Sequence, residues 1–143
     1  MIDAAALTAE IQNDPTTLGY APFVAAGNDQ AIADLLNTLR VGISVNRDTV
    51  TGNEFLAAVV LSDYTALVDA DSKAWVKSLA SMATIDVKNA NIRAIVAGMF
   101  PGGSATRANL VALQTRQGSR AEQLFGAGNS VSIFDIARAL GRG

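Results

Sequence analysis

Polar residues and glycines interrupt every apolar run in the stretch 85–126, so the chain is not expected to form one long helix there. Asn89, Ser104 and Ser119 each stand directly before a helix-favouring segment. A side-chain oxygen at such a position accepts a backbone N–H that the first helical turn leaves unpaired. Gly118 is expected to end one of these segments, because glycine is poor in helix interiors. This stretch therefore predicts short helices joined by tight turns.

The same alternation of caps, apolar stripes and glycine or proline stops runs through the rest of the chain. Leu36 and Leu39 follow Ile32 at the i+4 and i+7 spacing, which is typical of a buried helix face. Thr51 and Glu54 match a capping box. The predicted helices cover residues 4–13, 30–39, 52–60, 63–68, 90–99, 105–117 and 133–140. Another ends at 81, Ser119 opens a further helix with a capping box closed by Glu122, and one helical turn is expected at 21–26. We predict a mostly α fold, a compact bundle of seven or eight short helices in one domain over residues 1–143.

Two short runs alternate apolar and polar residues, which is the period of a β-strand. They cover residues 41–45 and 84–87. A lone strand would leave its backbone N–H and C=O groups unpaired. We therefore predict that 41–45 and 84–87 pair with each other as a small two-stranded ribbon.

The chain contains neither cysteine nor histidine, and this removes whole classes of chemistry. A Ser-His-Asp triad, a thiolate nucleophile and a zinc site built on His or Cys are all excluded. Any remaining chemistry would need Asp, Glu, Lys or Tyr, or Mg²⁺ held by carboxylates. Asp63, Asp69 and Asp71 lie close in sequence but lack the glycine turn and closing Glu of a Ca²⁺ loop, so we interpret them as helix caps. We expect a non-enzymatic protein without catalytic residues, cofactor or metal.

Charge is spread unevenly along the sequence. Residues 1–87 carry a net charge of −7 and residues 88–143 carry +5, within a total of −2. Such a split indicates an acidic side and a basic side, unless the fold intermixes the two halves. The predicted interface residues are Lys88, Arg93, Arg107, Arg116 and Arg120.

These basic residues suit either an acidic protein surface or DNA phosphate. The neighbouring aromatic residues Phe100 and Phe125 are expected in the core, which argues against a platform for stacking single-stranded bases. Trp75 is likewise expected in the core, because it falls on the apolar stripe of its helix. The loop 101–104 before Arg107 could receive an anion, but it has neither a Walker A nor a dinucleotide-binding pattern. We interpret that loop as a helix stop followed by an N-cap.

Several phrases of the sequence carry a resemblance to a known family. They are DPTTLGYA (14–21), TGNEFLAA (51–58), NIRAIVAGMF (91–100), SATRANL (104–110) and SRAEQL (119–124). Together they resemble a family of small virion-associated proteins of tailed bacteriophages and prophages, over most of the chain. The turn at 127–130 departs from the basic, glycine-containing turn of that pattern. The resemblance implies a phage setting but no activity, and no functional residues carry over from it.

We therefore expect a structural protein of a tailed-phage virion, such as a neck or head–tail adaptor or a minor tail component. Its expected partners are other phage structural proteins and further copies of itself in a ring. It would lie in the virion, and in the host cytoplasm during assembly. A phage assembly factor or a DNA-contacting accessory protein is the alternative. No membrane association is expected, because apolar runs such as 55–61 and 95–100 fall far short of the roughly 20 residues of a membrane span.

Overall fold

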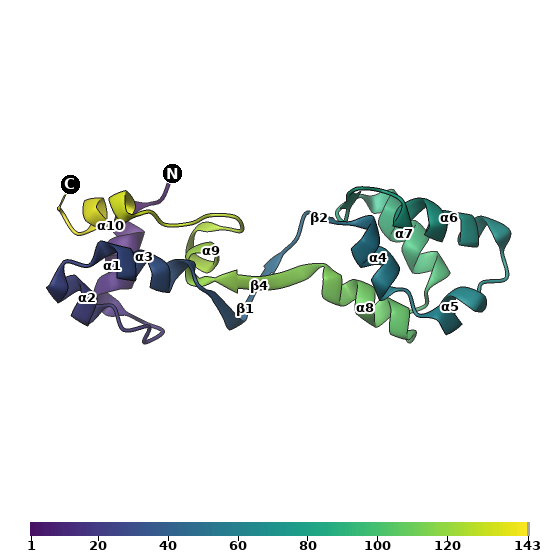
Figure 1. The fold of residues 1–143 in the computed structure, drawn as a ribbon, viewed down its shortest axis with the longest axis horizontal. Helices are drawn as coiled ribbons and strands as arrows, with labels where there is room; N and C mark the ends of the chain where they lie inside the picture. Colours follow the sequence, from purple (N-terminus) through teal and green to yellow (C-terminus); the bar gives the residue numbers. More distant parts are fainter. Residues whose placement is uncertain (143) are drawn as a thin grey trace. The chain divides into compact units, whose positions relative to one another are not determined.

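The computed structural model describes residues 1–142, and this part of the chain is 56% helical, which confirms the mostly α fold (Figure 1). Its helices are α1 (Ala4–Asn13), α2 (Ala21–Ala26), α3 (Asp29–Asn37), α4 (Gly52–Ala58), α5 (Leu61–Thr65), α6 (Ala70–Ala80), α7 (Ala90–Met99), α8 (Ala105–Leu113), α9 (Arg120–Phe125) and α10 (Ile133–Ala139). Its strands are β1 (Leu39–Asn46), β2 (Thr49–Val50), β3 (Ile85–Asp86) and β4 (Thr115–Ser119). Every helix is short, as the caps and turns predict.

The chain divides into two compact units. Unit 1 combines residues 1–45 with the described residues from Gln117 onward, and unit 2 is the continuous segment 46–116. Unit 2 is therefore an insertion within unit 1, and the chain passes from one unit to the other within β1 and again within β4. The expectation of a single domain stays a prediction.

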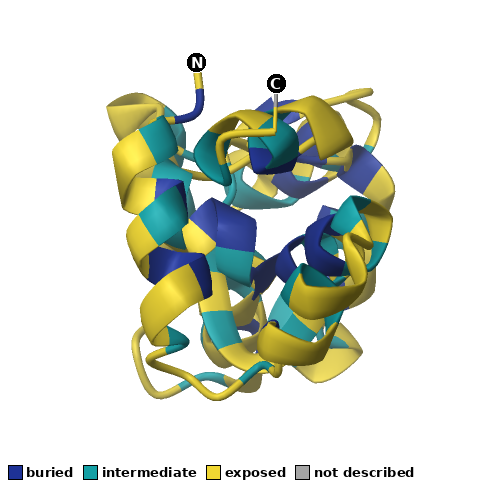
Figure 2. Ribbon diagram, turned by 90° about the vertical axis from the view of Figure 1, so that its left-hand side faces the viewer, coloured by how far each residue is buried: buried dark blue, intermediate teal, exposed yellow. Residues whose placement is uncertain are grey.

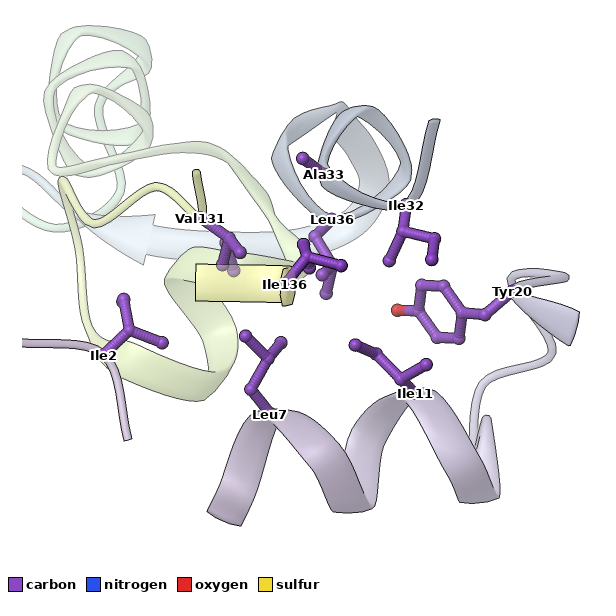
Figure 3. Close-up of a cluster of buried hydrophobic side chains, with 10 residues drawn as sticks. Ile2, Leu7, Ile11, Tyr20, Ile32, Ala33, Leu36, Val131 and Ile136 are labelled. Carbon is purple, nitrogen blue, oxygen red and sulfur yellow. The ribbon is translucent and has the colours of Figure 1, made fainter. Parts of the chain in front are cut away.

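The core of unit 1 joins helices from both ends of the chain. Helix α10 packs against α1 and α3, and α3 also packs against α2 and α9. Figure 3 shows Leu7 and Ile11 of α1 pointing toward side chains of α3 and toward Tyr20, which precedes α2. Buried residues accordingly lie on the inner faces of these helices, with exposed residues on their outer faces (Figure 2).

The predicted stripe of α3 is confirmed for two of its members. Ile32 and Leu36 are buried, but Leu39 is exposed. The prediction was wrong for Leu39 because α3 ends at Asn37 and Thr38 is already extended, so Leu39 opens strand β1. A residue that leaves the helix no longer shares its apolar face.

The core of unit 2 is formed by α4, α6, α7, α8 and the β2–β3 pair. Helix α4 packs against α6 and α8, with Phe55 of α4 buried beside Val76 and Leu79 of α6. The expectation that Trp75 belongs to the core was wrong, because its exposed fraction is 46%. The buried stripe of α6 is centred on Val76 and Leu79, and Trp75 lies at its edge.

The predicted segment 41–45 lies within strand β1, and β3 covers only Ile85–Asp86 of the predicted segment 84–87. These two strands pair with different partners from the ones predicted. Strand β2 pairs with β3 in antiparallel fashion, with Thr49 opposite Asp86 and Val50 opposite Ile85. Strand β1 pairs with β4. The predicted ribbon between 41–45 and 84–87 was therefore wrong in its pairing.

The cause is the segment after α8, which was predicted to be helical to residue 117. Helix α8 ends at Leu113, and the extended segment 115–119 gives β1 a partner. Gly118 permits the close approach of the two strands, because an added Cβ would lie 2.8 Å from a methyl group of Val45. Real Cβ contacts are essentially never that short.

The capping box before α4 is confirmed and is reinforced by an arginine. Thr51 Oγ1 accepts the Glu54 N–H at 3.0 Å, and Glu54 Oε1 accepts the Thr51 N–H at 3.0 Å. The Arg47 guanidinium donates to both carboxylate oxygens of Glu54, at 2.6 and 2.8 Å. These hydrogen bonds, chiefly those from Arg47, lower the pKa of Glu54 to about 2. Ser119 and Ser132 open their helices with equivalent capping boxes.

We expect the Glu54→Gln variant to lose part of the pH dependence of unfolding. The pKa of Glu54 is lower in the folded chain than its ordinary value of 4.5, so its stabilising effect is full above that value and disappears as the pH falls toward about 2. Urea unfolding from pH 6 down to pH 2 measures this. The difference in free energy of unfolding between the two proteins should shrink across that window. A constant difference would contradict the role of the Glu54 charge.

Gly52→Ala should destabilise unit 2 by about 2 kcal/mol, because a Cβ there has no room. The Gly52 N–H donates to the Met82 carbonyl at 3.0 Å, and an added Cβ would lie 2.3 Å from that oxygen and 2.5 Å from the Ala80 carbonyl oxygen. The matched control is Gly98→Ala in α7, where nothing lies within 4 Å. It should stabilise by roughly 0.5–1 kcal/mol. Chemical denaturation of both variants tests this, and equal stabilities would refute it.

Candidate functional site

The five basic residues that the sequence predicts as one interface are divided between the two units. Lys88, Arg93, Arg107 and Arg116 belong to unit 2, whereas Arg120 belongs to unit 1. Lys88 forms an exposed ion pair with Asp48, and Arg116 lies in β4. Only Arg93 and Arg107 come together, on the wall of one cavity.

Arg120 has a structural role in unit 1. Its guanidinium donates to both carboxylate oxygens of Glu10, at 2.9 and 2.7 Å, and the Tyr20 hydroxyl donates to the same carboxylate at 3.0 Å. The side chains of Arg120 and Glu10 are only 12% and 2% exposed. Burial, followed by the nearby Glu10 charge, raises the pKa of Tyr20 above its ordinary value. Arg120 is therefore committed to the core and is a poor candidate for a contact surface.

Unit 2 has an open cavity of about 420 Å³ between α7, α8 and the β2–β3 pair. A cavity of this size with mostly apolar walls is typical of binding sites. Arg93 of α7 and Arg107 of α8 are its two charged lining residues, and Gln114 adds an amide. The apolar lining residues are Val50, Phe55, Leu79, Ile85, Val87, Ile92, Ala94, Val96, Ala97, Leu110 and Val111.

A partly buried hydrogen-bond network fixes α8, and with it Arg107. Thr106, which is fully buried, donates to Asp63 of α5 from its N–H at 2.9 Å and from its hydroxyl at 2.6 Å. These two bonds hold the pKa of Asp63 below its ordinary value. The Arg107 guanidinium in turn donates to the Phe100 carbonyl at 3.1 Å, which fixes its position at the cavity wall.

The loop 101–104 is a helix stop followed by an N-cap, as interpreted from the sequence. Helix α7 ends at Met99, and Ser104 Oγ accepts the Arg107 N–H at 3.1 Å at the start of α8. The sequence did not reveal the Asp63–Thr106 contact, because its partners are 43 residues apart. Asp63 was expected to cap its own segment, and nothing local distinguishes that role from the observed one.

A second open cavity of about 480 Å³ lies elsewhere in unit 2, against α4, α5 and α6. Leu56 and Leu61, both exposed, contribute to its lining, and Lys77 is its one charged lining residue. This cavity is almost wholly apolar, so it has little to orient a polar ligand. The first cavity offers both an apolar wall and fixed positive charge, and it is the stronger candidate for specific binding.

Residues 1–142 contain neither a cluster of metal-ligating side chains nor a helix suited to a membrane span. No group of three or more Asp or Glu side chains among them is placed to hold a metal ion. No helix in the same part of the chain is long and apolar enough to cross a membrane. Comparison with protein-family models, characterised proteins and solved structures found no match.

Arg120→Met should lower the free energy of unfolding by about 3–5 kcal/mol, because it leaves the Glu10 carboxylate buried without its cation. The double variant Glu10→Gln, Arg120→Met should recover part of this loss, since it removes the unpaired charge. Lys88→Met is the matched control, because its ion pair with Asp48 is exposed and should contribute far less. Urea unfolding of all four proteins measures the effects. Equal losses for Arg120→Met and Lys88→Met would contradict a core role for Arg120.

Proposed function

We propose that this chain is a non-enzymatic structural protein of a tailed-phage virion. Within the particle it would be a neck or head–tail adaptor, or a minor tail component, that assembles through protein–protein contacts. The observation that carries the proposal is the open apolar cavity of unit 2 with Arg93 and Arg107 on its wall. Such a surface suits a protein partner that brings both an apolar group and negative charge.

Exposed apolar side chains add support for an assembly role. Phe134 and Val41 in unit 1 are 78% and 95% exposed, and Leu61 and Val68 in unit 2 are 74% and 100% exposed. A scattered exposed apolar residue is normal on a soluble protein. Leu61 lines the second apolar cavity of unit 2. Together with the two apolar cavities, such exposed residues favour burial against a partner. The resemblance of phrases such as 14–21 and 119–124 to virion-associated proteins points in the same direction.

The net charges of the two units give little support to contacts between an acidic surface of one copy and a basic surface of another. Unit 1 has seven acidic and four basic residues, a net charge of −3, whereas unit 2 has six acidic and seven basic residues, a net charge of +1. The fold thus intermixes much of the acidic and basic halves of the sequence. Charge complementarity in an assembly would therefore belong to particular sites and not to whole halves of the sequence.

The DNA-contacting alternative has less support. Of the five residues that would contact phosphate, Lys88 and Arg120 already form ion pairs, and Arg107 donates to a backbone carbonyl. Binding of DNA through these groups would require the existing contacts to be broken. We therefore place a role in DNA contact or as an assembly factor second.

The proposal predicts that the protein is a fixed component of purified particles. A tagged copy would be expressed in the host during particle production, and the particles would be purified by density gradient. Quantitative mass spectrometry should give a constant ratio of this chain to the major head protein, because a structural component is incorporated in fixed copy number. A tagged replication protein of the same phage serves as the negative control. Absence of the chain from intact particles would contradict the proposal.

A further inference from the structure

The cavity of unit 2 presents a positive charge without a partner among the described residues. Arg93 is exposed on α7 and lines the cavity, and no ion pair or side-chain hydrogen bond joins its guanidinium to the rest of residues 1–142. Ala94 and Ala97 of the same helix are also exposed and line the cavity. Their small side chains leave the apolar wall open to an incoming group. A matching partner would bring a small apolar side chain with a carboxylate close to it.

The connection between α5 and α6 has this chemistry. Val68 is fully exposed there, and Asp69 and Asp71 follow it, both also exposed. Asp69 caps α6 by accepting the Asp71 N–H at 3.0 Å, whereas the Asp71 carboxylate has no partner among the described residues. We call residues 66–71, which are the connection and the first two residues of α6, the acidic loop.

The acidic loop and the cavity lie at different ends of unit 2. In Figure 1 the connection from α5 to α6 lies far from β2 and from the end of α8 that leads into β4, and both of those elements contribute to the cavity. No residue of the acidic loop lines the cavity. The loop of one copy is therefore placed to reach the cavity of another copy and not its own.

We propose that the chain self-associates head to tail, with the acidic loop of one copy in the unit 2 cavity of the next. Val68 packs against the apolar wall, and Asp71 pairs with Arg93. This contact joins two different surfaces of the same subunit, so it generates a closed ring or an open filament. The inference rests on the proposed assembly function and specifies the surfaces used.

Other exposed apolar residues of this chain match the cavity less well. Val41 follows Arg40, so its insertion would bring a further positive charge toward Arg93. Phe134 precedes Asp135, but that carboxylate already accepts hydrogen bonds from Ser132 within a capping box. Among residues 1–142, only the acidic loop combines a fully exposed apolar side chain with an unpaired carboxylate three residues away.

The test measures self-association of the full chain by analytical ultracentrifugation. Val68→Lys in the loop and Arg93→Glu in the cavity should each weaken self-association by about 100-fold. The lysine at 68 would bury a charge against the apolar wall, and the glutamate at 93 would face the like charge of Asp71. Leu39→Lys and Lys77→Glu are the matched controls, since they introduce the same new charges at exposed sites outside the contact. Both controls should associate like the original protein. Far-UV circular dichroism and thermal unfolding establish that each variant is folded.

Mixing the two variants gives a sharper test. The Val68→Lys protein keeps an intact cavity, and the Arg93→Glu protein keeps an intact loop. A mixture should therefore form one native contact per pair and stop at a heterodimer, while each variant alone stays monomeric. Larger mixed assemblies, or no heterodimer, would overturn the inference.

Failure of this inference can be told apart from failure of the proposed function. If the original protein is monomeric throughout, or if Val68→Lys and Arg93→Glu associate normally, the head-to-tail contact is wrong. Incorporation of the chain into particles is measured separately and does not depend on that contact. A chain present in particles but unaffected by these substitutions would use another surface, and this result would refute the inference alone.

Discussion

The structure depends first on the pairing of the two chain segments that form unit 1. Its two segments are separated in sequence by the whole of unit 2. The buried pair of Glu10 and Arg120 joins them, with partners 110 residues apart. Asn37 also exchanges two hydrogen bonds with the backbone of Val131, at 2.7 and 2.8 Å. A buried charge is costly without its partner, so this pairing strongly disfavours other arrangements of the two segments.

The short helices make such long-range contacts necessary. A helix of about ten residues is marginal in water, so its stability comes from caps and from packing against neighbours. Caps such as Thr51 and Ser132 satisfy the first backbone N–H groups locally. Burial of Tyr20, Leu36 and their neighbours then stabilises helices that would not persist alone.

Local interactions could be predicted from the sequence, whereas long-range interactions could not. Caps at Asn89, Ser104 and Ser119 were predictable, because capping depends on residues within one helical turn. The pairing of β1 with β4 was not, because an alternating strand pattern does not specify its partner. Burial of Glu10 was also hidden, since it depends on an arginine far along the chain.

The cavity of unit 2 likewise depends on packing that the sequence does not specify. The sequence indicated Arg93 and Arg107 as contact residues, but their grouping depends on how α7 packs beside α8. The alanines at 94 and 97 favour helix, and their small side chains leave the cavity open. Larger apolar residues there would fill the cavity from within and give unit 2 a more complete core of its own. The open cavity beside an unpaired arginine therefore makes better physical sense in a unit that completes its packing against a partner.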